Sequence, residues 1–129
     1  VPAARLGLGY EMPGVRKLID VVGPAYAKEI FYTARQFSAA EALAMGLINR
    51  MVPDAELKAM IGGYAEMIAA NAPLTVASIK TIVGEAMKDE SERDDALCDR
   101  VVAECFDSDD YIEGRRAFME KRAPAFKGK

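Results

Sequence analysis

The sequence predicts a mainly α-helical fold with at most one short strand. Apolar residues recur at intervals of three and four through most of the 129 residues, which is the period of a helix with one buried face. Proline, glycine and short polar side chains separate these segments, as they do at helix ends. The length suits one domain with a modest core. The clearest apolar stripe consists of Leu57, Met60, Ile61, Tyr64, Met67 and Ile68.

The N-terminal part is expected to contain an irregular start followed by two helices. Glycines within residues 1–10 permit turns, so no regular element is expected there. A helix is predicted from Pro13 to Gly23, because proline suits the first turn of a helix and glycine favours its end. A second helix is predicted from Pro24 to Ala34, with apolar residues along one side.

Residues 37–53 (FSAAEALAMGLINRMVP) form the most informative stretch of the chain. Ser38 and Glu41 have the spacing of a capping box, in which each side chain bonds to the other residue's backbone N–H at a helix start. Gly46 is expected to end this short helix in the left-handed conformation. Ile48–Val52 is then expected to be a short extended segment, closed by a proline.

Four further helices are predicted in the rest of the chain. They run from Asp54 to Asn71, from Pro73 to Met87, from the charged cluster Lys88–Asp95 to Cys105, and from Asp109 to Arg122. Aspartate is a favourable residue at the start of the first of them. The last has acids at its beginning and bases at its end, which suits the helix dipole.

Composition excludes several classes of function. The net charge of −3 does not fit a nucleic-acid binder, and no apolar run approaches the length of a membrane span. The absence of histidine excludes Ser-His-Asp and Cys-His catalysis within this chain, and no metal site is expected. Proton transfer must therefore rest on carboxylates, tyrosine or lysine. The two cysteines, Cys98 and Cys105, are too far apart on a helix to bridge, which favours a cytoplasmic location.

Two groups of residues are candidates for a site. Glu11 precedes a predicted helix just after Gly7-x-Gly9, where it is either a residue that complements the helix dipole or part of an anion site. The second group shares one face of the last helix, where an aromatic ring and a lysine could contact one ligand. The alternative is a core phenylalanine beside a lysine whose stem lies along apolar surface. This group consists of Tyr111, Gly114, Phe118 and Lys121.

Three stretches, taken in order, resemble the crotonase (enoyl-CoA hydratase/isomerase) superfamily. The central stretch, residues 37–53, carries the family's signature. Residues 2–23 are similar to the segment that flanks the family's active site. Residues 113–126 are similar to its closing helix. The matching positions are Gly7, Gly14, Leu18 and Gly23 in the first stretch and Glu113, Gly114, Ala117, Phe118, Glu120, Lys121, Arg122 and Phe126 in the last.

The resemblance implies that residues 1–129 are the helical C-terminal region of a ClpP/crotonase-type spiral fold, without its N-terminal β/α core. It also implies a homotrimer or hexamer that acts on acyl-CoA thioesters through an enolate stabilised by backbone N–H groups. Coenzyme A would be part of the substrate, and no separate cofactor is expected. Phe118 would line the acyl pocket and Lys121 would help to hold the CoA phosphate, while the isolated chain would be inactive.

One departure from the family bears on the reaction. The glutamate that serves as a catalytic acid in hydratases would fall at Ala3, which cannot transfer a proton. No catalytic residue is therefore assigned, and Glu11 is a candidate replacement. The resemblance implies a hydro-lyase or an isomerase. With Ala3 at this position, either another group serves or the reaction is one that needs a single acid or base, such as isomerisation, thioester hydrolysis or decarboxylation. The alternatives are a helical oligomerisation module and a pseudoenzyme that binds acyl-CoA.

Overall fold

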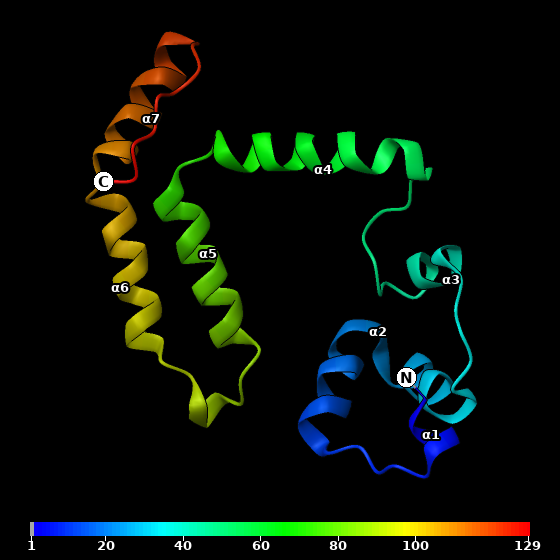
Figure 1. Ribbon diagram of the computed structural model, residues 1–129. Helices are drawn as coiled ribbons and strands as arrows, with labels where there is room; N and C mark the ends of the chain where they lie inside the picture. The colour runs from blue at the N-terminus through cyan, green and yellow to red at the C-terminus, as the bar shows by residue number, and fades with distance from the viewer. Residues whose placement is uncertain (1) are drawn as a thin grey trace. The chain divides into compact units, whose positions relative to one another are not determined.

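The computed structural model describes residues 2–129, which form helices joined by short loops and contain no strand (Figure 1). The chain divides into two compact units, one ending at Glu56 and the other comprising Leu57–Lys129. The first unit contains α1, α2 and α3, and α4 begins at the boundary. The elements are α1 (Ala3–Leu6), α2 (Met12–Thr33), α3 (Ala39–Ala44), α4 (Asp54–Ala69), α5 (Pro73–Ala86), the 3-10 turn η1 (Glu90–Glu92), α6 (Asp95–Phe106) and α7 (Asp109–Glu120).

The chain begins with a short helix where an irregular segment was expected. α1 is only four residues long, which is too short for apolar periodicity to reveal. Gly7 ends it in the left-handed conformation, with φ of +66°. The N–H of Leu8 then donates to the carbonyl oxygen of Ala3 at 3.1 Å, which satisfies a helix-end acceptor.

The predicted break at Gly23 is confirmed. α2 continues across it as a kinked element, because Gly23 adopts φ of +76° and ψ of 166° and Pro24 starts the following helical segment. The kink lets the two halves of α2 contribute to one small core. Its buried members are Val22, Ala27, Ile30 and Met45, and Leu18, Ile19 and Phe37 pack against them.

The capping box at the start of α3 is confirmed in both directions. The N–H of Glu41 donates to Ser38 Oγ at 3.3 Å, and the N–H of Ser38 donates to Glu41 Oε2 at 2.8 Å. Gly46 ends the helix at φ of +79°, as predicted. The expected short strand at Ile48–Val52 is not formed, since these residues share no hydrogen-bonded ladder with another described segment.

The second unit is built on the antiparallel pair α5 and α6, which lie side by side (Figure 1). The connection contains η1, so the charged cluster 88–95 is mostly loop and not a helix start. Glu85 holds this loop, because its carboxylate accepts from Lys88 Nζ at 2.7 Å and from the N–H of Asp94 at 2.9 Å. Asp94 in turn caps α6 by accepting from the N–H of Leu97.

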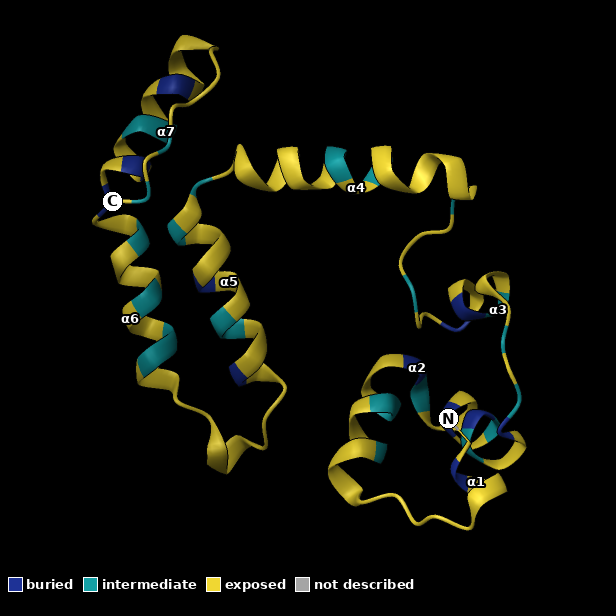
Figure 2. Ribbon diagram, in the orientation of Figure 1, coloured by how far each residue is buried: buried dark blue, intermediate teal, exposed yellow. Residues whose placement is uncertain are grey.

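α4 buries none of its residues, although its apolar stripe is the clearest in the sequence (Figure 2). Asp54 is its first helical residue instead of the residue that caps it. No large side chain of the described residues is fully enclosed anywhere in the chain. These helices therefore present much apolar surface that they do not bury among themselves.

Candidate functional site

An open apolar groove of about 620 Å³ lies in the second unit, between α5, the C-terminal part of α6, α7 and the C-terminal segment. Its floor and walls are mostly aromatic and aliphatic side chains. Such a groove binds apolar ligand groups, with a few polar atoms at its edge to orient them. It is lined by Ala72, Leu74, Thr75, Ser78, Ile79, Ile82, Val102, Cys105, Phe106, Ser108, Asp110, Tyr111, Gly114, Arg115, Phe118, Met119 and Phe126.

The groove brings together three of the four residues that share the predicted face of the last helix. Tyr111, Gly114 and Phe118 all line it. Phe118 is 82% exposed, so its ring stands at the rim of the groove and is not a core side chain. Ser108 holds the start of α7 in place, because its Oγ accepts from the N–H of Tyr111 at 3.1 Å.

Lys121 lies beyond the end of α7 and outside the groove lining. It adopts the left-handed conformation, with φ of +53°, and its N–H donates to the carbonyl oxygen of Phe118 at 3.3 Å. The predicted helix to Arg122 therefore ends at Glu120, and the chain reverses at Lys121. Among residues 2–129, no carboxylate forms an ion pair with Lys121.

The adjacent cation, Arg122, is engaged by two carboxylates. Its Nη1 lies 2.6 Å from Glu113 Oε1, and its Nε lies 2.6 Å from Glu120 Oε2. The N–H of Ala125 also donates to Glu113. The Arg122 guanidinium, followed by this N–H, lowers the pKa of Glu113 to about 2. Lys121 is thus the cation at this turn that remains available to an anion.

Ala3 is buried at 5% exposure in the first unit. It lines a separate hollow of about 440 Å³ together with Tyr10 and Phe31, whose ring centroids are 5.0 Å apart. Glu11 precedes α2 at the N-cap position but is not among the residues that line this hollow. Its side chain makes no capping hydrogen bond, so the carboxylate is exposed to solvent.

Sequence reasoning missed Phe126, Asp110 and Tyr10 as residues of these cavities. Their position depends on the return of the chain after α7 and on the turn after α1, which no local pattern specifies. The turn residue Gly7 and the Ala-Pro pair after Arg122 were the available signals. Within residues 2–129, no group of three or more potential ligands is arranged to hold a metal ion. No single helix of that range has both the length and the apolar character to cross a membrane.

Comparison with known proteins establishes the family. Residues 1–129 match the family described as enoyl-CoA hydratase/isomerase, and the chain belongs to this family. Its helices are the helical part of a crotonase-type fold. The predicted resemblance is thereby confirmed.

Individual relatives are about one-third identical to this chain over the matched region. Methylmalonyl-CoA decarboxylase of Escherichia coli (strain K12) is 38% identical over 129 residues, which cover 95% of this chain and 48% of that protein. Carnitinyl-CoA dehydratase of Salmonella typhi is 34% identical, covering 100% of this chain and 51% of that protein. An enoyl-CoA hydratase/carnithine racemase from Magnetospirillum magneticum has a TM-score of 0.88 at 33% identity, covering 100% and 48% of the two chains. The chain thus spans about half the length of the relatives it matches.

Proposed function

We propose that the protein containing this chain acts on acyl-CoA thioesters by forming and stabilising an enolate. The observation that carries the proposal is the match of the whole chain to the enoyl-CoA hydratase/isomerase family, with relatives named for reactions of CoA thioesters. Residues 1–129 would be the C-terminal helical region of that protein, inactive by itself. The backbone N–H groups that polarise the thioester carbonyl would belong to the β/α core.

Within this chain, we assign Phe118 to the acyl group and Lys121 to a CoA phosphate. The exposed ring of Phe118 at the rim of an apolar groove supports the first assignment, because an acyl group is bound chiefly by apolar contact. The absence of an ion pair to Lys121 among residues 2–129 supports the second. A lysine already neutralised by a carboxylate would attract phosphate poorly.

The proposed reaction uses at most one acid or base from the first unit. Ala3 supplies no proton, so a hydratase mechanism with two glutamates would need another group in its place. The exposed carboxylate of Glu11 is the candidate acid or base, in a hydro-lyase, isomerase or decarboxylase reaction. A Glu11→Gln variant of the full-length protein should lose about a hundredfold or more in kcat, because general acid–base catalysis contributes about 10²- to 10⁴-fold. Undiminished turnover would exclude this role.

The phosphate assignment is tested by calorimetric titration of the full-length protein with butyryl-CoA and with its 3′-dephospho analogue. Lys121→Gln should weaken butyryl-CoA binding by about tenfold, because one charge-assisted contact is lost. It should leave binding of the analogue unchanged. Lys127→Gln removes a positive charge from the same segment and is the matched control. An equal effect of Lys121→Gln on both ligands would contradict a contact between Lys121 and the 3′-phosphate.

A further inference from the structure

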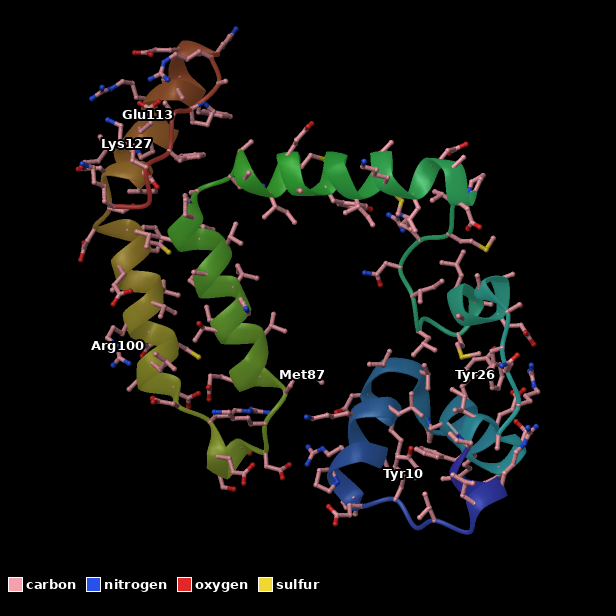
Figure 3. All side chains as sticks on the ribbon, viewed as in Figure 1. Tyr10, Tyr26, Met87, Arg100, Glu113 and Lys127 are labelled. Atoms are coloured by element: carbon pink, nitrogen blue, oxygen red, sulfur yellow. The ribbon has the colours of Figure 1, made fainter. Side chains whose placement is uncertain are left out.

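The segment Ala123–Lys129, which we call the strap, runs back along α7 after the chain reverses at Lys121. The reversal is fixed by hydrogen bonds of the helix end, in which the N–H of Arg122 donates to the carbonyl oxygen of Ala117 at 3.0 Å. Figure 3 labels Lys127 of the strap and Glu113 of α7, and the N–H of Ala125 in the strap donates to Glu113 Oε1 at 3.0 Å. The strap has no regular secondary structure, so its position must come from contacts with α7 and α5.

Asp110 provides the principal contact. Its Oδ1 accepts from the N–H of Lys127 at 2.6 Å, and its Oδ2 accepts from the N–H of Gly128 at 2.7 Å. Its own N–H donates to the carbonyl oxygen of Lys129 at 3.3 Å. Asp110 is only 3% exposed, although most acids at helix starts face solvent. An ionised carboxylate that accepts two backbone N–H groups at short distance forms strong hydrogen bonds.

The strap completes the groove. Phe126 is half-buried and lines the groove, and it packs against the bare backbone of Gly114. A Cβ atom at Gly114 would lie 3.5 Å from Phe126 Cε1, so the ring already lies in contact with the helix. Gly128 lies beside Pro73, the first residue of α5. The strap therefore contacts both α7 and the start of α5, and its Phe126 forms part of the groove wall.

We propose that the strap is a releasable latch, that Asp110 is the residue that holds it closed, and that Phe126 sets the length of acyl chain that the groove accepts. The part that concerns the acyl chain rests on the proposed function. With the strap closed, the Phe126 ring forms part of the groove wall. With the strap released, the space that the ring fills is open to a longer chain. Segments held by a few hydrogen bonds open locally without global unfolding, which makes such release accessible.

Two measurements on the full-length protein test the proposal. The first is hydrogen exchange at the amides of Lys127 and Gly128, and the second is calorimetric binding of butyryl-CoA and decanoyl-CoA. Asp110→Asn should speed exchange at these amides by about tenfold or more. The asparagine oxygen accepts less strongly than a carboxylate oxygen, and its NH2 group would face one of the backbone N–H donors of the strap. Asp110→Asn and Phe126→Ala should both shift the ratio of the two affinities toward decanoyl-CoA by about tenfold.

Asp109→Asn is the matched control. Asp109 lies in the same first turn of α7, is exposed and carries the same charge, but it makes no hydrogen bond to the strap. If the amides of Lys127 and Gly128 exchange as slowly in Asp110→Asn as in Asp109→Asn, Asp110 does not hold the strap closed. Faster exchange with an unchanged affinity ratio in both Asp110→Asn and Phe126→Ala would overturn the role of the strap in chain selection. Absence of acyl-CoA binding by the unaltered protein would instead overturn the proposed function, whatever the exchange result.

Discussion

α2 and α4 carry apolar stripes of the same kind, but the side chains of these two helices lie in different surroundings. Ile30 of α2 is 6% exposed, whereas Ile61 of α4 is 56% exposed. α2 is kinked at Gly23, so that both of its halves contribute to the core that Met45 completes. α4 has no comparable contact and buries none of its residues. The comparison teaches that periodicity identifies the apolar face of a helix but not whether the same chain covers it.

The largest expected difference is in the free energy of unfolding, between two isoleucine-to-alanine substitutions. In the chain 1–129, Ile30→Ala should lower the free energy of unfolding by about 2–4 kcal/mol, because it removes buried methyl groups and leaves a cavity. Ile61→Ala should change it by less than about 0.5 kcal/mol, because Ile61 is more than half exposed to solvent. Urea denaturation followed by circular dichroism measures both. Equal losses would show that the stripe of α4 is covered in solution.

The second prediction concerns assembly. We expect the full-length protein to form a homotrimer or hexamer, in which the apolar face of α4 is a contact surface. Ile61→Lys should then reduce the mass measured by light scattering toward that of the monomer, because a lysine in an apolar contact is costly to desolvate. Ala59→Lys places the same charge about 200° around the helix and should have no effect. Intact assembly of Ile61→Lys would exclude this face from the contact.

The smallest effect on stability is expected at the end of α7, where polar contacts hold the chain in place and little apolar surface is buried. The pKa of Glu113 is lowered from 4.5 to about 2, so the carboxylate binds protons less readily in the folded state than in the unfolded state. The stability that this contributes is fully present above pH 4.5 and is lost as the pH falls toward about 2. Hydrogen exchange at the Ala125 amide, compared across this range, measures the loss.

A Glu113→Gln variant is the control for that titration. It keeps the size of the side chain but removes the titrating group, so the protection of Ala125 should be weaker at neutral pH and nearly independent of pH in the same window. Protection that falls with pH equally in the variant would assign the pH dependence to another group. In both proteins Arg122 stays charged throughout, since an arginine side chain is not deprotonated at these pH values. In the unaltered protein Glu113 and then Glu120 raise its pKa further above the ordinary value.

The elements that the sequence predicted correctly are those whose stabilising contacts join residues close together in the sequence. The capping box of Ser38 and Glu41 and the left-handed Gly46 involve atoms within one or two turns, so residue identity and spacing are sufficient. The same holds for the break at Gly23. The expected strand at Ile48–Val52 failed because a strand requires a partner, and the sequence of one segment does not supply it. The family was also readable from three ordered stretches of residues.

The sequence by itself therefore determined where the longer helices lie and to which family the chain belongs, but not the four-residue α1 or the exact ends of α6 and α7. Only the tertiary structure decided which apolar faces are buried and which residues meet at the groove. Phe118 and Phe126 both line the groove although they come from a helix and a returning strap, and Asp110 reaches amides 17 and 18 residues away. The physical reason is that hydrogen bonds within a helix are local, whereas cavities form where distant segments pack together.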